Sequence, residues 1–202
     1  MRKIALATAF IGVFVVPALA QTPAAPPPVR VRGIIEKVDG DNLTVKARDG
    51  ADMKVAVTPT TRLQSLIKKS LADIKAGDFL ASTGMKGADG KIHAIEVRIF
   101  PEAQPDGGRQ FAWDLGSDSV MTNASVGTVA EAPQGKLVHV KFKDGESEYS
   151  IGPEVPILAP VPGDKSLLKP GVAVFLAGPK GADGTVTATF MYVEKDGIKP
   201  PM

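Results

Sequence analysis

The chain of 202 residues contains no cysteine and only two histidines, His93 and His139. Without cysteine there can be no disulfide, no thiolate metal ligand and no thiol nucleophile. The two histidines occupy unlike positions, and neither has carboxylates at the spacing of a metal site. We therefore expect both at the surface, with His139 facing solvent beside Lys141, and no metal bound between them.

Sequence motifs of catalysis are also missing. There is no Gly-x-Ser-x-Gly elbow, no phosphate-binding loop and no dinucleotide fingerprint. The aspartate-rich turns at residues 39–41 and 49–52 resemble fragments of calcium loops, but both stop before the remaining ligand positions. Turn formation by itself explains aspartate before glycine. The sequence thus predicts a protein that is not an enzyme and holds neither a metal nor another cofactor.

Long hydrophobic runs are lacking except at the start of the chain. A basic start, Met1-Arg2-Lys3, precedes an apolar stretch that ends at Pro17, and Ala18-Leu19-Ala20 follows. This pattern is typical of a secretory signal peptide over residues 1–20, cleaved after Ala20. A transmembrane anchor is the alternative, but the stretch is short for a span and contains proline. We expect a periplasmic protein with Gln21 as its first residue.

Without the signal peptide, the chain has no excess of either charge. The formal net charge of +2 comes from Arg2 and Lys3, so the mature chain has 24 − 2 = 22 basic residues against 22 acidic ones. Nucleic-acid binders normally carry a clustered basic excess, and in the sequence Lys and Arg do not gather around Phe190 and Tyr192. We expect nucleic-acid binding no tighter than the non-specific range, about 0.1 mM or weaker.

What the sequence does contain is an internal repeat. The run Lys86–Gly90 recurs identically at Lys180–Gly184, an offset of 180 − 86 = 94 residues. The same offset relates several other residues, and it becomes 95 between the first turn and the second hairpin. The pairs are Gly33 with Gly127, Pro59 with Pro153, Lys75 with Lys169, and, at 95, Gly40 with Gly135 and Lys46 with Lys141. A constant offset over so many turn residues indicates a duplicated domain.

Each copy alternates apolar and polar residues with period two between Asp-Gly turns, which is typical of short antiparallel strands. Helical spacing occurs once per copy: at Leu71 to Lys75, where Ser70 can cap the turn, and at Lys165 to Lys169. We predict an all-β protein with two tandem small barrels, OB-like or SH3-like, at residues 29–100 and 123–196. A two-sheet sandwich that spans both copies is the alternative.

Three segments lie outside the copies. Residues 21–28 form a proline-rich tether, residues 197–202 a tail, and residues 101–122 a linker that carries Phe111, Trp113 and Leu115. These three side chains are expected to fill the seam between the barrels or, alternatively, to contact a partner. If they fill the seam, Trp113→Ala should cost roughly 3–5 kcal/mol and split the thermal transition in two.

Several longer motifs stand out in the mature chain: Val31 to Gly50, Ser70 to Asp78, Phe100 to Glu102, Trp113 to Leu115 and Met121 to Ala124. In these motifs the chain resembles a family of proteobacterial exported proteins of unknown function. The resemblance implies tandem OB-like barrels and brings no catalytic residues. Some members are labelled metal-transporter permeases, which does not suit this chain, because nothing after Ala20 approaches the apolar length of a membrane span.

From these observations we expect a protein-interaction or scaffold module of the cell envelope, with an envelope protein as its partner. A small-ligand or metal-ion binding protein is one alternative. A hydrolase with an unrecognised site is the other, and it would need a Ser or Asp within hydrogen-bond reach of a histidine in a cleft.

Overall fold

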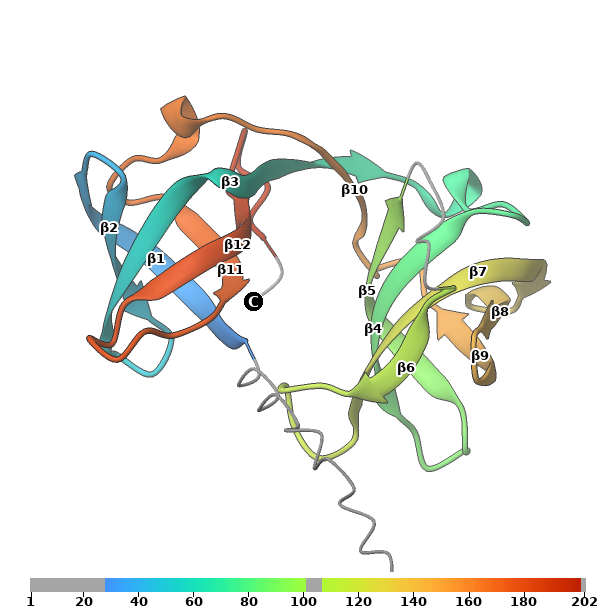
Figure 1. Ribbon diagram of the computed structural model, residues 1–202. Coiled ribbons are helices and arrows are strands. Elements are labelled where there is room, and N and C mark those ends of the chain that lie inside the picture. Colours follow the sequence, from blue (N-terminus) through green and yellow to red (C-terminus); the bar gives the residue numbers. More distant parts are fainter. Residues whose placement is uncertain (1–27, 101–106, 201–202) are drawn as a thin grey trace, which may run out of the picture.

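The computed structural model describes residues 28–100 and 107–200. The expected signal peptide, the tether up to residue 27, the first part of the linker and the last two residues of the tail lie outside these ranges. The described chain is all-β, as the sequence predicts (Figure 1). Its strands are β1 (Val29–Asp39), β2 (Asn42–Ala47), β3 (Asp52–Lys69), β4 (Phe79–Lys86), β5 (Ile92–Phe100), β6 (Arg109–Ala112), β7 (Ser119–Ala132), β8 (Gly135–Phe142), β9 (Gly145–Ile151), β10 (Ile157–Pro162), β11 (Ala173–Gly178) and β12 (Val186–Val193).

Five strands from the two ends of the chain close one barrel, which we call the terminal barrel. The ring of pairings runs β1–β2–β3–β12–β11 and returns to β1; only β3 with β12 is parallel. Its core holds Val31, Ile35, Val45, Val55 and Leu176, together with further buried aliphatic residues from all five strands. Closure leaves the ring without a free edge.

Five strands from the middle of the chain form the corresponding ring of the second barrel, the central barrel. Here the pairings run β7–β8–β9–β5–β4 and return to β7, and β9 with β5 is the parallel pair. Its separate core includes Leu80, Val97, Val138, Tyr149 and Ile151. The short strand β6 pairs with β7 outside the ring.

The strand pairings correct the expected domain boundaries at 29–100 and 123–196. Strands β1 to β3 belong to the first copy but close with β11 and β12 of the second. In turn, β7 to β9 of the second copy close with β4 and β5 of the first. Each barrel is thus built from three strands of one copy and two of the other, an exchange of strands between duplicated units.

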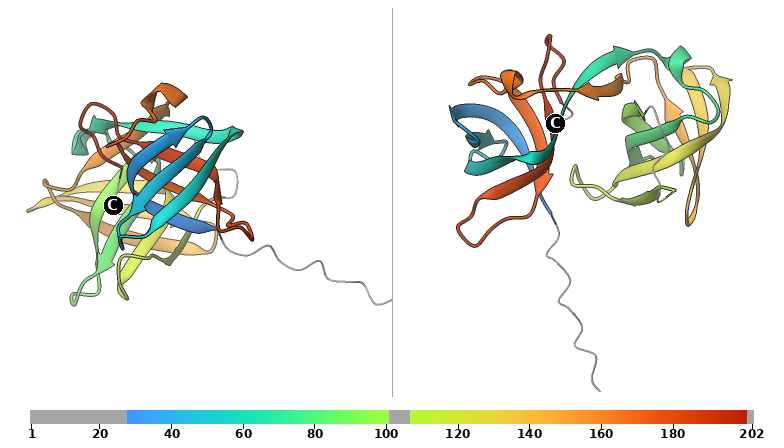
Figure 2. Two further views of the ribbon diagram at one scale, coloured as in Figure 1. Left: turned by 90° about the vertical axis from the view of Figure 1, so that its left-hand side faces the viewer. Right: turned by 45° about the horizontal axis from the view of Figure 1, so that its top comes forward.

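Two arms carry the chain between the barrels, and they pair with each other (Figures 1 and 2). The second half of β3 runs antiparallel to β10, with partners from Gln64↔Pro162 to Lys69↔Ile157. Leu66 pairs with Pro160, and these two residues are 160 − 66 = 94 positions apart. Because this offset is that of the repeat, equivalent positions meet at the pairing, which places a pseudo-twofold axis between the arms.

Burial confirms the repeat and corrects one part of its alignment. The offset of 94 relates buried Val55 and Val57 on β3 to Tyr149 and Ile151 on β9. In the first strand, however, the bulge follows Ile35 in β1 and Val126 in β7, an offset of 126 − 35 = 91. Gly33 is therefore equivalent to Ala124 rather than to Gly127. The β7–β8 hairpin is longer beyond its bulge, and this length absorbs the difference.

The expected helical turns are present but short. Leu71–Asp73 and Lys165–Leu167 form single 3-10 turns. In the first turn the Asp73 carboxylate accepts from the amide and the hydroxyl of Ser70, and Asp164 caps the second turn by accepting from the Ser166 amide at 2.7 Å. Among the described residues no helix is long and apolar enough to cross a membrane.

The exchanged strands predict how the chain responds to cleavage. A protease site can be placed within residues 101–106. After cutting, the two pieces should stay associated as one particle, because each barrel contains strands from both pieces. Size-exclusion chromatography and a thermal melt of the cut protein would check this. Two pieces that separate and behave as monomeric folded barrels would contradict the exchange.

Candidate functional site between the barrels

A third group of packed side chains lies between the two barrel cores. It consists of the buried residues Leu66, Leu158, Phe175 and Tyr192, with Trp113, Phe190 and Ile198 packed against them. We call it the seam cluster. Its members come from both arms, from β11 and β12, from the turn after β6 and, with Ile198, from the segment after β12. The cluster therefore joins parts of the chain that are far apart in sequence.

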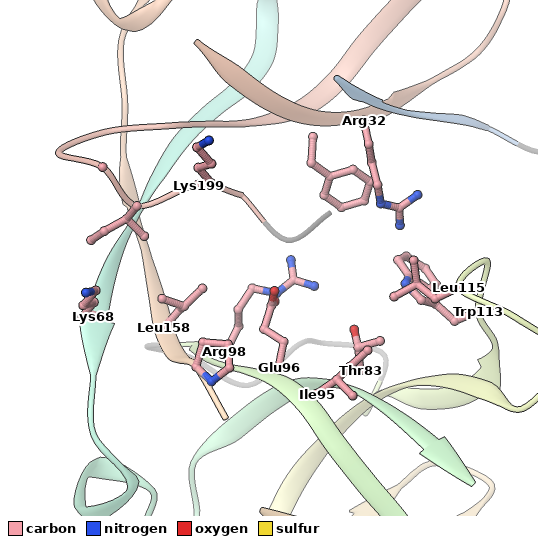
Figure 3. Close-up of a pocket in the computed structure, with 14 residues that line it drawn as sticks. Arg32, Lys68, Thr83, Ile95, Glu96, Arg98, Trp113, Leu115, Leu158 and Lys199 are labelled. Carbon is pink, nitrogen blue, oxygen red and sulfur yellow. The ribbon is translucent and has the colours of Figure 1, made fainter. Parts of the chain in front are cut away.

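Two hollows open beside the seam cluster. The larger, which we call the cleft, has a volume of about 570 Å³, and the smaller, the cavity, about 390 Å³. Arg98, Trp113 and Phe175 line both. Volumes of this size at an interface between barrels are typical of ligand sites. Figure 3 shows the cavity, with Glu96 and Arg98 rising from β5 toward its middle.

Aromatic rings form one wall of the cleft, and they pack against one another. Phe175 lies at the centre, edge-on to Trp113 at 6.4 Å and to Phe190 at 5.7 Å between ring centroids, and stacked on Tyr192 at 6.4 Å. Phe111 packs edge-on against Trp113 at 5.9 Å. Such pairs add to the burial of apolar area. Trp113 thus contacts the terminal barrel although it follows a strand of the central barrel.

Arginines gather around these rings, so the sequence interpretation that Lys and Arg do not surround Phe190 and Tyr192 is wrong. The guanidinium of Arg30 lies 4.3 Å from the Trp113 ring, that of Arg32 lies 4.5 Å from Phe175, and that of Arg98 lies 5.3 Å from Tyr192. Arg62 and Arg109 also line the cleft. They come from strands β1, β3, β5 and β6, so no stretch of sequence displays the cluster.

Most of these arginines have no carboxylate partner. Arg32 donates two hydrogen bonds to Asp114, at 2.7 and 2.8 Å, and the Arg32 guanidinium holds the pKa of that carboxyl below its ordinary value against the opposing effect of burial. Within residues 28–100 and 107–200, no ion pair involves Arg30, Arg62 or Arg109. The cleft therefore carries a local positive excess in a chain whose overall charge is nearly balanced.

The two barrels present different chemistry to each other at equivalent positions of the repeat. With the offset of 94, Phe190 corresponds to Glu96 and Tyr192 to Arg98, and Phe175 corresponds to Ala81. The terminal barrel thus contributes rings where the central barrel contributes a charged pair. This contrast between the copies is the sequence signal that could have found Glu96 and Arg98, which the sequence analysis missed.

Glu96 and Arg98 are an almost fully buried ion pair. Their side chains are 8% and 6% exposed, and Arg98 Nε lies 2.9 Å from Glu96 Oε1. The two atoms are close but not aligned, and neither makes a hydrogen bond of good geometry with any described residue. Burial raises the pKa of the Glu96 carboxyl, and the neighbouring Arg98 and Arg32 only partly oppose this. Buried charges left with open hydrogen-bonding capacity are costly to stability.

The structure places all three predicted linker residues at this site. Phe111 and Trp113 are half-buried in the cleft wall, and Leu115 is half-buried against the cavity. Buried Ser119 fixes the turn: its hydroxyl donates to the Trp113 carbonyl at 2.9 Å, and it accepts from the Leu115 amide at 3.1 Å. The Trp113 ring is therefore held against Phe175 and Arg30 rather than displayed on a loose loop.

The histidines lie elsewhere. His93 Nε2 is 3.1 Å from the Asp89 carboxylate on an exposed turn, and half-buried His139, which we had expected to face solvent, is 3.5 Å from Glu146. In the described part of the chain, no three His, Asp or Glu side chains converge as a metal would require. The Asp89–His93 pair has the spacing that the hydrolase alternative asks for, but neither residue lines the cleft or the cavity.

Comparison with known proteins yields no relative: no family model, no curated protein and no solved structure matches this chain.

The half-buried position of Trp113 revises the expected effect of removing it. Trp113→Ala should lower the free energy of unfolding by about 2 kcal/mol, less than the loss for a fully buried ring, because part of the ring stays in water. The thermal transition should remain single, since the paired arms and the seam cluster couple the two barrels. Calorimetry would check both, with Trp113→Phe as the control that retains most of the contact with Phe175. Two separate transitions in Trp113→Ala would contradict the coupling of the barrels.

The buried carboxyl of Glu96 predicts a specific pH dependence of stability. Its pKa is raised on folding from the ordinary value of 4.5, so the native state holds the proton more tightly than the unfolded state does. The corresponding stability is present below that ordinary value and is lost as pH rises through the raised pKa. The melting temperature of Glu96→Gln minus that of the wild type should therefore increase as pH rises above the ordinary value of 4.5.

Glu154→Gln, at an exposed turn residue, serves as the matched control and should show no such trend. A difference between Glu96→Gln and wild type that is flat or falls with rising pH would contradict the role of burial at Glu96.

Proposed function

We propose that the protein is a non-catalytic interaction module that captures an acidic, extended polypeptide segment in the cleft between its barrels. The observation that carries this proposal is the set of unpaired arginines, Arg30, Arg62 and Arg109, placed beside aromatic side chains in one cleft. Arginine and aromatic residues are the side chains most enriched at the energetic centres of protein interfaces. A carboxylate-bearing segment complements this surface in both charge and polarity.

A peptide suits the cleft better than a nucleic acid does. Single-stranded nucleic acids bind by stacking bases on open aromatic faces along a basic groove. Here the rings of Phe175 and Tyr192 are buried, and the guanidinium of Arg30 covers the Trp113 ring. The rings therefore offer edges rather than open faces to a ligand. Carboxylates need only the guanidinium groups, which remain exposed at Arg30, Arg62 and Arg109.

The short strand β6 supports an extended conformation of the ligand. Among the described residues β6 pairs only with β7, so one of its edges has no neighbouring strand. Two of its residues, Arg109 and Phe111, line the cleft. A peptide that adds to this edge would gain main-chain hydrogen bonds while its side chains reach the arginines.

The barrels themselves are, we infer, of the OB type. Each has five strands and, when these are counted in the order of the repeat (β1, β2, β3, β11, β12 and β7, β8, β9, β4, β5), the third strand pairs with the fifth and a helical turn precedes the fourth. Barrels of this type commonly bind ligands at a sheet face and the adjoining loops. Together with the signal pattern at residues 1–20, this favours a periplasmic location and an envelope protein as partner.

The proposal can be tested by fluorescence anisotropy with labelled peptides. An extended peptide rich in Glu and Leu should bind, its Gln-substituted counterpart should bind more weakly, and the binding should weaken with added salt. The double variant Arg30→Gln/Arg62→Gln should lose at least about fivefold in affinity, as expected for two exposed charge pairs. Lys37→Gln/Arg48→Gln removes the same charge from exposed positions outside the cleft and should bind like wild type.

A single-stranded oligonucleotide of equal charge is the competing probe in the same assay. Submicromolar, salt-dependent oligonucleotide binding that is lost in the arginine double variant would replace the peptide proposal with a nucleic-acid one. Absence of binding by both probes would refute the cleft as an anionic site.

A further inference from the structure

We propose that the cavity receives the C-terminal residue of the captured segment and reads its α-carboxylate together with the N–H next to it. This inference rests on the proposed function, because the cavity is continuous in its lining with the cleft: Arg98, Trp113 and Phe175 belong to both. It narrows the ligand from an acidic segment to the end of a polypeptide chain.

The middle of the cavity holds one donor and one acceptor that face each other as an ion pair at 2.9 Å but make no hydrogen bond of good geometry. Glu96 Oε1 and Arg98 Nε are more than nine-tenths buried by side chain and have no hydrogen-bond partner among the described residues. Both side chains line the cavity, and Figure 3 shows them directed into it. Polar atoms buried in this way usually have a hydrogen-bond partner. A ligand that supplies an acceptor to Arg98 and a donor to Glu96 would satisfy both.

The end of a polypeptide has this combination of groups within one residue. Its α-carboxylate accepts from a guanidinium, and its amide N–H, two bonds from the carboxylate carbon, donates to a carboxylate. The neighbouring ammonium groups of Lys68 and Lys199 add positive charge for the carboxylate. An internal peptide segment has the N–H but no carboxylate at the adjacent position, so it cannot serve Arg98 in the same way.

The remaining walls of the cavity indicate an apolar last side chain. Trp113 and Leu115 lie on one side in Figure 3, and Leu158 lies on the other. Phe175 completes the apolar lining. These walls exclude water around an aliphatic or aromatic side chain, whereas a charged last side chain would lose its hydration there. A C-terminal Leu or Phe is therefore the expected ligand residue.

The repeat argues for one such site, rather than two, in the described part of the chain. At the positions equivalent to Glu96 and Arg98, the terminal barrel carries Phe190 and Tyr192. It therefore has no matching donor and acceptor, and the seam has a single charged side. The expected stoichiometry is one chain end per protein molecule.

The test compares ligands that differ by one group, which requires no change to the protein. A labelled Glu-rich peptide ending in a free Leu carboxylate should bind about tenfold or more tightly than its C-terminal amide, since the bond to Arg98 is charge-assisted. Replacing the last amide N–H by an ester oxygen should weaken binding about fivefold, because Glu96 then loses its donor. Isothermal titration calorimetry gives both ratios and the stoichiometry.

Protein variants show which residue is responsible for each of the two affinity ratios. Arg98→Gln should reduce the acid-to-amide ratio to about one, and Glu96→Leu should reduce the amide-to-ester ratio to about one. If Glu96→Leu folds poorly, Glu96→Gln is the second variant, because it keeps the shape of the side chain. It should reduce the amide-to-ester ratio in part. Arg109→Gln, which lies in the cleft but not in the cavity, should weaken all ligands without changing either ratio.

The outcomes separate this inference from the proposed function. Equal binding of acid and amide, with affinity still dependent on Arg30 and Arg62, would overturn the chain-end inference and leave the acidic-segment proposal standing. Absence of binding by every peptide would overturn both. Free leucine that binds as tightly as the peptide acid would show an amino-acid site and overturn the assignment to a polypeptide end.

Discussion

The pairing of the two arms is the constraint on which the rest of the structure depends. Where β3 runs against β10, the chain passes from one barrel to the other in both copies, with Leu66 opposite its own equivalent, Pro160. Each barrel is closed by strands of both copies, so the two copies cannot part without opening both rings. The cleft between the barrels is held in place by the paired arms and by the seam cluster. A site fixed in this way needs little ordering when a ligand enters.

Stability by itself does not explain the chemistry of the seam. Replacing a buried ion pair by packed apolar residues is often neutral or stabilising, and the duplication offers that solution within the same chain: Phe190 and Tyr192 stand where the other copy has Glu96 and Arg98. The aromatic side of the seam packs against Trp113 and Leu158 as a core would. The charged side keeps two buried polar atoms without hydrogen bonds. This asymmetry favours a binding role for the charged side.

The sequence predicts local structure well here because local structure depends on local patterns. Period-two alternation and Asp-Gly turns place the strands, and Ser70 with Asp73 places the first helical turn. The strand exchange cannot be predicted from local patterns, since an exchanged and an unexchanged pair of barrels have the same strands, the same turns and the same repeat offset. The arginine cluster is hidden because Arg30, Arg62 and Arg98 belong to three separate strands, and only the packing of the two barrels places them on one cleft. The alignment of Gly33 with Gly127 failed because a longer hairpin shifts the first strand by three residues.

The strand exchange also explains how Trp113, a residue of the linker, can contact both barrels. The turn that carries it is anchored to the central barrel through β6 and Ser119, while its ring lies on Phe175 and beneath Arg30 of the terminal barrel. In two barrels of contiguous copies, this linker would merely connect neighbours. In the exchanged fold the arms already connect the barrels, so the linker is free to form a wall of the cleft. A duplicated fold thereby acquires one asymmetric site, built where its two equivalent faces meet.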